Sequence, residues 1–387
     1  MVRPMASLRI SELPGSLSHR FALRAQREHR NLARQALLGL RDALGVDTSA
    51  RRRRVLTAGA LVLTLTQPAW AGATLDAVKQ RGFVQCGVNT GLPGFSNADE
   101  KGNWTGLDVD VCRAVAAAIF GGADKVRFTP LTAKERLTAV QSGEVDLLSR
   151  NTTWTLTRDT SLGIHFTGVT YYDGQGFMVS KALGVSSARE LDGAAVCILA
   201  GTTTELNLAD YFRTHGMTYD PVVFDTADQT ARGFEAGRCD VLTSDQSQLY
   251  GLRIKLAEPD KAMVLPEVIS KEPLGPAVRQ GNDDWFNIVR WTLYALINAE
   301  ELGVTSGNVD EMKSSSNPEV RRLLGLEGIK GSGLGLPDDW AYQIIKQVGN
   351  YGEIFERNVG AGSPLKIERG LNALWKDGGL QYAPPIR

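Results

Sequence analysis

Residues 146–158 read DLLSRNTTWTLTR, and this stretch is the most informative part of the chain. An apolar strand, with Val145, Leu147 and Leu148, runs into a loop that is crowded with hydroxyl and amide side chains and ends at Arg158. A planar guanidinium with short donors such as Thr153 beside it is well suited to hold a small carboxylate. The alternative interpretation is a strand and a turn followed by an ordinary surface arginine. The other segments of the chain decide between the two.

Strands and helices alternate on both sides of this stretch, which predicts an α/β fold with largely parallel sheets. The first series is expected to have strands at 83–88, 126–129 and 145–148 and helices at 108–120 and 132–142. A second series of the same kind begins at Phe177. Its elements are strands at 195–199, 222–224 and 241–243, helices at 201–214 and 227–236, and then a long helix at 283–302.

Two stiff crossovers, near Gly174 and near Pro273, suggest that one α/β unit is inserted within another. Residues 74–174 and 273–387 would then form a first lobe with a helical C-terminal extension. Residues 178–270 would form a second lobe. Two lobes joined by two crossovers make a hinge, and a hinge makes a cleft that can close on a ligand.

The N-terminal part has the pattern of an export signal. Arginines fill 51–54, an uncharged run covers 55–66, and Pro68-Ala69-Trp70-Ala71 follows with small residues. This pattern predicts a secretory signal over 51–73, cleaved after Ala71 or Ala73, with a twin-arginine signal as the alternative. The uncharged run is shorter than the roughly 20 residues of a membrane span. Residues 1–50 are interpreted as a stretch upstream of the true translation start or as a long leader extension, and in either case as absent from the mature protein.

Removal of residues 1–71 leaves 31 basic and 39 acidic residues, a net charge of −8. This balance argues against nucleic acid as a partner. No cysteine follows the apolar run as a lipid acceptor, since the first is Cys86. We therefore expect a protein that is free in the periplasm of a two-membrane bacterium and acts as a monomer.

Four cysteines, Cys86, Cys112, Cys197 and Cys239, allow three pairings in an oxidising compartment. Cys86 is expected on the first strand and Cys112 on the helix after it, while Cys197 and Cys239 lie on or just before strands of the second series. We predict the bridges Cys86–Cys112 and Cys197–Cys239, with buried free thiols as the alternative. No C-x-x-C pattern occurs, so neither a metal site nor a cofactor is expected.

Several segments, taken in order, resemble the periplasmic solute-binding proteins of polar and general L-amino-acid ABC transporters, bacterial solute-binding protein family 3. They are GVNTGLPGFS at 87–96, GLDVDVCRAVAAAIF at 106–120, SGEVDLLSRNTTWTLTR at 142–158, YYDGQGFMVSK at 171–181, GTTTELNLADYF at 201–212 and GRCDVLTSDQSQL at 237–249. The segment GLPDDWAYQIIKQVGNYGEIFERN at 335–358 is similar to the general L-amino-acid subgroup. The resemblance implies the type II periplasmic-binding-protein fold, with each lobe a mostly parallel sheet flanked by helices around a two-crossover hinge.

The resemblance also implies roles for the polar loop of the first lobe. Arg158, twelve residues after Asp146, matches the arginine that binds the α-carboxylate of the ligand. Asn151 and Thr153 match loop positions that contact the α-amino and α-carboxylate groups. For Asn151, bracing of the loop is the alternative role.

Two further matches lie in the second lobe. Thr202 and Thr203 stand at a helix start, where N–H groups and hydroxyls are expected to complete the carboxylate shell. Asp245 matches the acid that pairs with the α-ammonium group. The structural alternatives are a helix N-cap for Thr202 and a turn former for Asp245.

The chain departs from some relatives after the first strand. Relatives that prefer Lys, Arg or His carry an acid and an aromatic residue where this chain has Asn89 and Leu92. A cationic side chain would find neither a fixed partner nor a stacking plate there. We therefore expect a broad ligand pocket, with Asn89 among its residues.

The implied function is capture of L-amino acids outside the cytoplasm and their delivery to a membrane ABC permease and its ATPase. The alternative is an enzyme on the same fold, similar to periplasmic cyclohexadienyl dehydratases. Catalysis would need a positioned acid or base beyond those used for binding, and the sequence offers no distinctive one. We therefore do not expect an enzyme.

Overall fold

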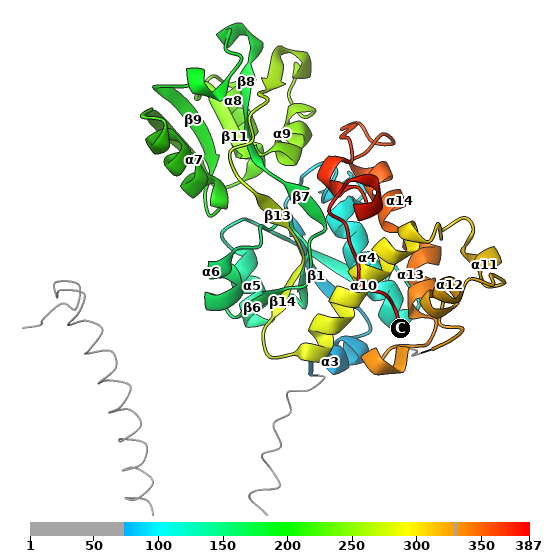
Figure 1. Ribbon diagram of the computed structural model, residues 1–387. Coiled ribbons are helices and arrows are strands. Elements are labelled where there is room, and N and C mark those ends of the chain that lie inside the picture. The colour runs from blue at the N-terminus through cyan, green and yellow to red at the C-terminus, as the bar shows by residue number, and fades with distance from the viewer. Residues whose placement is uncertain (1–72, 329–330) are drawn as a thin grey trace, which may run out of the picture. The chain divides into compact units, whose positions relative to one another are not determined.

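The computed structural model of the chain describes residues 73–328 and 331–387 (Figure 1). The leader over 1–50 and the secretory signal over 51–73 lie outside the described residues, apart from Ala73, and stay predictions. The described residues form one compact unit. No helix in the described part of the chain has both the length and the apolar character that a membrane crossing needs.

The first lobe is built on a five-stranded sheet with the order β4-β1-β5-β14-β6. Strand β1 (Val84–Asn89) pairs in parallel with β4 (Val126–Leu131) and with β5 (Leu147–Leu148). Strand β14 (Ala277–Arg279) runs antiparallel to β5 and to β6 (Ile164–Phe166). Because β14 follows the return crossover, the chain completes this sheet only after it has built the second lobe.

The second lobe repeats this plan with the strand order β10-β9-β11-β8-β12. Strand β9 (Ala194–Leu199) pairs in parallel with β10 (Tyr219–Phe224) and β11 (Val241–Asp245). Strand β8 (Gln175–Ser180) runs antiparallel to β11 and to β12 (Ala262–Val264). The predicted α/β class and the two-lobed architecture are confirmed, while the exact limits of the two lobes stay predictions.

Two short strands carry the chain between the lobes. Strand β7 (Tyr171–Asp173) pairs antiparallel with β13 (Glu272–Leu274), so the two crossovers lie side by side (Figure 1). Gly275 follows β13 directly, and a Cβ atom there would lie 1.9 Å from the carbonyl oxygen of Gly168. Only glycine allows the backbones to approach this closely, which explains the glycine within the stiff segment EPLGP.

The first-lobe sheet is covered by helices α3 (Ala73–Arg81), α4 (Leu107–Phe120), α5 (Arg136–Ser142), α6 (Leu156–Ser161) and α10 (Asp283–Glu301). Helix α4 is buried along almost its whole length, because it contacts β1 on one side and helices of the C-terminal extension on the other. This double burial explains why its sequence is apolar nearly all round instead of along one stripe.

Helix α5 begins later than its sequence pattern predicts. Thr132 and Glu135 bond to each other as a capping pair should, with Thr132 N–H donating to Glu135 Oε2 at 3.1 Å and Glu135 N–H to Thr132 Oγ1 at 3.3 Å. Regular helix nevertheless starts only at Arg136 and ends, as predicted, before Gly143. The capping contacts therefore order the turn ahead of the helix.

The second-lobe sheet carries helices α7 (Thr203–Thr214), α8 (Ala227–Glu235) and α9 (Gln246–Arg253). A small hairpin of β2 (Asn97–Ala98) and β3 (Trp104–Thr105) precedes α4 in the first lobe.

The C-terminal extension contains helices α11 (Val309–Met312), α12 (Pro318–Leu323), α13 (Trp340–Val348) and α14 (Tyr351–Asn358). Helices α13 and α14 pack on α4 and α10 (Figure 1). The extension also holds a crossover strand, because Asn372 accepts the N–H of Tyr172 at 2.7 Å and donates to its carbonyl at 3.1 Å.

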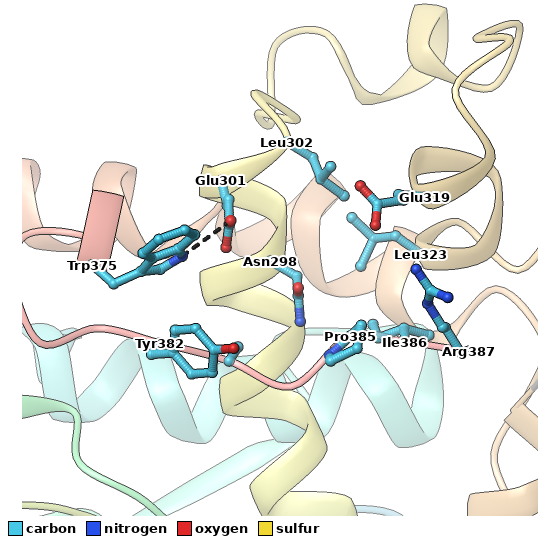
Figure 2. Close-up of a pocket in the computed structure, with 11 residues that line it drawn as sticks. Asn298, Glu301, Leu302, Glu319, Leu323, Trp375, Tyr382, Pro385, Ile386 and Arg387 are labelled. Carbon is cyan, nitrogen blue, oxygen red and sulfur yellow. Dashed lines mark hydrogen bonds between the residues drawn. The ribbon is translucent and has the colours of Figure 1, made fainter. Parts of the chain in front are cut away.

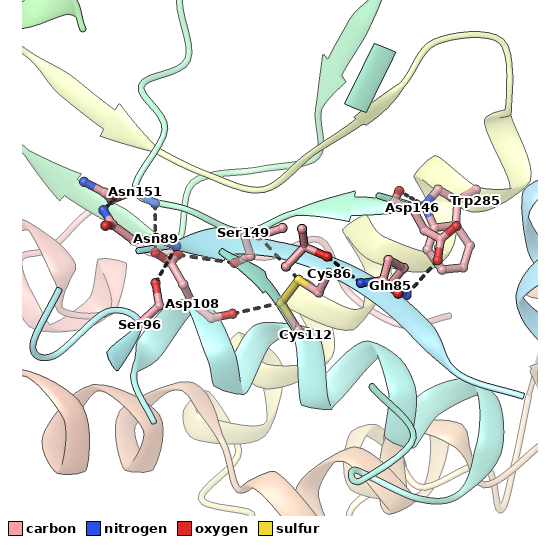
Figure 3. Close-up of a disulfide and its surroundings, with 12 residues drawn as sticks. Gln85, Cys86, Asn89, Ser96, Asp108, Cys112, Asp146, Ser149, Asn151 and Trp285 are labelled. Atoms are coloured by element: carbon pink, nitrogen blue, oxygen red, sulfur yellow. Dashed lines mark hydrogen bonds between the residues drawn. A yellow bond between two sulfur atoms is a disulfide. The ribbon is translucent and has the colours of Figure 1, made fainter. Parts of the chain in front are cut away.

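Both predicted disulfides are confirmed. Cys86 and Cys112 join β1 to α4, with Cα atoms 6.2 Å apart (Figure 3). Cys197 and Cys239 join β9 to the turn before β11, with Cα atoms 5.6 Å apart. Each bridge therefore lies within one lobe, and neither restrains the movement of one lobe against the other.

Candidate functional site

Asp108, in the first turn of α4, holds the polar loop between β5 and α6 in place. Asp108 Oδ2 accepts the backbone N–H of Asn151 at 2.8 Å, and Oδ1 accepts the Ser149 hydroxyl at 3.2 Å (Figure 3). Asn151 has φ of +27°, a left-handed conformation that asparagine tolerates better than most residues. Asp108 thus fixes the loop at the point where its backbone turns.

Asp108 is itself almost fully buried, with 3% of its surface exposed. Burial raises the pKa of Asp108 to about 6, although the bonds from Asn151 and Ser149 and the charge of Arg150 favour the ionised form. The loop is therefore attached to a group whose protonation changes near neutral pH.

Arg158 is buried, so the interpretation as a surface arginine is wrong. It lies in the first turn of α6, which Thr155 caps by accepting the Arg158 N–H at 3.3 Å. Its Nη1 donates to the carbonyl oxygen of Thr153 at 2.8 Å, which orients the guanidinium along the loop. Burial lowers the pKa of Arg158, while the charges of Glu272 and Asp245 act in the opposite direction.

The start of α7 brings the second lobe to this loop. The hydroxyl oxygens of Thr203 and Thr153 lie 3.4 Å apart, across the two lobes. Thr202 occupies the N-cap position of α7 but its side chain makes no capping hydrogen bond; its hydroxyl donates to the Leu199 carbonyl at 2.7 Å. The hydroxyl of Thr203, not that of Thr202, is thus the one that meets the first lobe.

Asp245 ends β11 and precedes α9, and it is buried with 7% exposure. Burial raises the pKa of Asp245 well above its usual range, and the charges of Asp173 and Glu272 add to this effect. Arg136 and Arg158 act in the opposite direction, so these arginines of the first lobe lie close enough to Asp245 to stabilise its charge. Arg158 and Asp245 therefore share one buried region.

A chain of amide side chains crosses between the lobes beside these charges. Asn89 Nδ2 donates to Asn151 Oδ1 at 2.9 Å, and Asn151 Nδ2 donates to Gln248 Oε1 at 3.0 Å. Asn151 thus braces the loop and also contacts α9 of the second lobe. Asn89 is buried within this row of hydrogen-bonded amides. Leu92, in contrast, is fully buried in the apolar core of the first lobe.

Three charged residues of this region were not singled out from the sequence: Arg136, Asp173 and Glu272. Glu272 in β13 has 1% exposure and accepts the hydroxyls of Thr153 at 2.6 Å and Thr203 at 2.9 Å. Burial raises the pKa of Asp173, its neighbour across the hinge strands, to about 6. A usable signal was present, because both acids lie in the crossover segments where the lobes meet.

Arg136 is a second buried arginine on the first-lobe side, with 3% exposure. Its Nη1 makes two long contacts, 3.4 Å to the Asn151 carbonyl and 3.3 Å to Thr152 Oγ1, and its Nε has no hydrogen-bond partner among the described residues. Burial lowers the pKa of Arg136, while Asp245 and Glu272 oppose that shift. It lies at the start of α5, within the residues predicted as helix, and nothing in the local sequence sets it apart.

One cavity lies apart from this region, on the C-terminal extension (Figure 2). It encloses about 270 Å³ between α10, α12 and the end of the chain. Glu301 accepts the indole N–H of Trp375 at 3.1 Å at its edge. None of the predicted ligand residues lines this cavity.

The part of the chain that the structure describes contains no cluster of three or more His, Cys, Asp or Glu side chains arranged to hold a metal ion. Where the lobes meet, Arg136 and Arg158 of the first lobe instead stabilise the charge of Asp245 in the second lobe. The ligand roles of Arg158, Asn151, Thr153, Thr202, Thr203, Asp245 and Asn89 stay predictions.

Comparison with known proteins gives consistent results. Residues 84–306 match the family described as "Bacterial extracellular solute-binding proteins, family 3". The general L-amino acid-binding periplasmic protein of Rhizobium johnstonii is 64% identical over 85% of this chain and 97% of its own length. The glutamate/glutamine/aspartate/asparagine-binding protein of Rhodobacter capsulatus is 53% identical over 84% of this chain and 96% of its own. A periplasmic binding protein from Brucella ovis, solved with glutathione bound, is 61% identical with a TM-score of 0.80, over 81% of this chain and 99% of that one.

Proposed function

The chain belongs to the bacterial extracellular solute-binding proteins of family 3, and from this premise we propose that it captures L-amino acids outside the cytoplasm and delivers them to an ABC permease. The observation that carries the proposal is the shared burial of Arg158 and Asp245, which come from different lobes. An amino acid in its zwitterionic form presents one group of each charge. It therefore matches this pair of opposite charges.

The α-carboxylate of the ligand is assigned to Arg158. The guanidinium is a planar fork of five N–H donors, and its one bond to the Thr153 carbonyl fixes the plane in which the others point. The N–H groups at the start of α7 add donors from the second lobe, in the way that a helix N-terminus binds any anion. The carboxylate would thus be shared between the lobes.

The α-ammonium group is assigned to Asp245. A buried carboxylate whose pKa is raised is costly to ionise unless a cation comes to it, and the ammonium group would supply that cation. Binding would then favour the ionised acid and release a proton in solutions where Asp245 was protonated. The carboxylate is shared between the lobes and only the second lobe offers a partner to the ammonium group, so the bound ligand stabilises the closed arrangement.

Broad selectivity among side chains is part of the proposal. Asn89 carries no charge, so it offers the ligand no fixed charge, and its amide is already bonded to Asn151. The name of the Rhizobium relative, a general L-amino acid-binding protein, supports the same breadth.

We assign the protein to the periplasm, after removal of the residues up to Ala71 or Ala73, because the Rhizobium relative is named as a periplasmic protein. We expect it to act as a monomer that meets the permease and its ATPase in the membrane. Binding, not catalysis, is the proposed activity, since the similar relatives are named as transport or binding proteins. Conversion of arogenate or prephenate by the pure protein would count against this assignment.

The test is a thermal-shift screen of the mature protein, residues 74–387, against the twenty L-amino acids. A ligand that binds only the native state raises the melting temperature in proportion to its affinity and concentration. Hits from several classes of side chain would support broad capture, while a single hit would make the protein a specialist. A screen without any hit would remove the proposed function.

A further inference from the structure

Glu272 lies where three parts of the proposed binding region meet. It is the first residue of β13, on the return crossover, and it is opposite Asp173 of β7 in the hinge ladder. Its carboxylate reaches both Thr153 of the first-lobe loop and Thr203 at the start of α7. One carboxylate therefore touches the hinge and both lobes at once.

Each carboxylate oxygen of Glu272 accepts two hydrogen bonds. Oε2 accepts from Thr153 and Thr203, while Oε1 accepts from Asn207 Nδ2 at 2.6 Å and from the Ser270 hydroxyl at 2.7 Å. An ionised carboxylate only accepts, and an amide nitrogen only donates. The four partners thus surround Glu272 as they would surround a buried negative charge.

These bonds limit what the two threonines can offer a ligand. A threonine hydroxyl has one hydrogen, and in both Thr153 and Thr203 that hydrogen is directed to Glu272. Each hydroxyl then presents only lone pairs toward the cleft. A ligand carboxylate can bond to Arg158 and to backbone N–H groups, but these two hydroxyls would repel it.

The charge of Glu272 acts in the same direction. Glu272 and Asp245 both stabilise the charge of Arg158, so the arginine is already shared between two acids before any ligand carboxylate arrives. A second carboxylate on the ligand would enter a region that already holds the buried Asp245 and Glu272, with the half-buried Asp173 acting on Asp245. Like charges in a space of low dielectric constant repel strongly.

We propose that Glu272 is a specificity-determining residue whose negative charge disfavours an anionic ligand side chain relative to the neutral side chain of the same shape. This inference rests on the proposed capture of amino acids. Glutamate and glutamine differ only in that charge, so the ratio of their dissociation constants isolates the effect. The influence of Glu272 on the α-carboxylate is common to both ligands and cancels.

The experiment measures the dissociation constants of L-glutamate and L-glutamine by titration calorimetry for the mature wild type and for Glu272→Gln. The glutamine side chain can still accept from Asn207 and Ser270, but it carries no charge. We expect the ratio Kd(glutamate)/Kd(glutamine) to fall at least tenfold in the variant. A ratio that stays within twofold of the wild-type value overturns the inference.

Glu267→Gln is the matched control, because Glu267 is an acid of the same segment that bonds to Ser187 instead of the cleft residues. It should leave the ratio unchanged. If Glu272→Gln does not fold, Asn207→Lys places a cation beside Glu272 on the partly exposed helix α7 and must lower the ratio in the same way. Loss of the proposed function is a different result, since the wild type would then bind no L-amino acid at all.

Discussion

The first lobe and the second lobe bring opposite charges to the place where they meet. On the first-lobe side, Arg136, Arg150 and Arg158 are buried, and the charge of Asp245 acts on all three. On the other side Asp245 ends a strand of the second lobe and Glu272 starts the returning hinge strand. The two lobes share one sheet plan, yet the residues at their facing edges differ in sign.

This difference suggests how two similar lobes can cooperate on one small molecule. In the proposed mode of binding, the arginines of the first lobe bind the negative end of a zwitterion, and Asp245 of the second lobe binds the positive end. Neither lobe satisfies the whole ligand, so affinity depends on both lobes being in contact with it. Substitutions that remove one charge at a time test this dependence on both lobes.

The largest effect is expected from Arg158→Ala. Removal of one partner from a buried ion pair costs roughly 3–5 kcal/mol, so amino-acid affinity should fall by at least about 100-fold in titration calorimetry. Arg158→Lys should recover only part of the loss, because an ammonium group cannot form the planar fork.

Arg213→Ala is the control for this substitution, since Arg213 is exposed and pairs with Asp210 on the outer part of α7. The circular dichroism of both variants should stay native. Near-normal binding by Arg158→Ala would show that the carboxylate of the ligand lies elsewhere.

An intermediate effect, on stability, is expected from Asp108→Asn. The folded-state pKa of Asp108 is about 6, above its value in the unfolded chain, so its contribution to stability is present at low pH and is lost as the pH rises through 6. Between about pH 4 and pH 7 the variant should gain up to about 3 kcal/mol in unfolding free energy relative to the wild type. Urea titrations at several pH values measure this difference. Parallel pH profiles for the two proteins would contradict the assigned shift.

The smallest effect is expected from Lys134→Ala. Lys134 Nζ lies 2.6 Å from Asp225 Oδ1, so this ion pair also joins the two lobes, but both side chains are more than half exposed. Exposed pairs contribute little, so amino-acid affinity should change by less than about threefold, and less again at high salt. A tenfold loss in calorimetry would mean that surface contacts, not the buried charges, govern closure.

Much of the fold follows from local sequence patterns. The alternation of strands and helices, the glycines and prolines of the crossovers and the spacing of the four cysteines are all short-range signals, and the sheets and both bridges agree with them. The start of α5 is an exception, because Thr132 and Glu135 form capping contacts ahead of the regular helix.

The residues of the candidate site depend less on local sequence patterns than the fold does. Arg158 stands out because it ends a polar loop after a strand, and the resemblance to the family indicates Asp245. Glu272 and Arg136 do not stand out, because each acquires its role from residues far away in the chain: Glu272 is 119 residues from Thr153, and the charge of Asp245 acts on Arg136. Such partners become visible only once the two crossovers have brought the lobes together.

The central claim is that one zwitterion is held at both ends, by Arg158 on one lobe and Asp245 on the other. Titration calorimetry of the mature protein with its strongest amino-acid ligand, with the N-acetyl derivative and with the α-amide tests it most directly. Each blocked compound should bind at least about 100-fold more weakly than the free amino acid, since each leaves one buried charge without its partner. An N-acetyl derivative or an α-amide that bound as tightly as the free amino acid would contradict the claim.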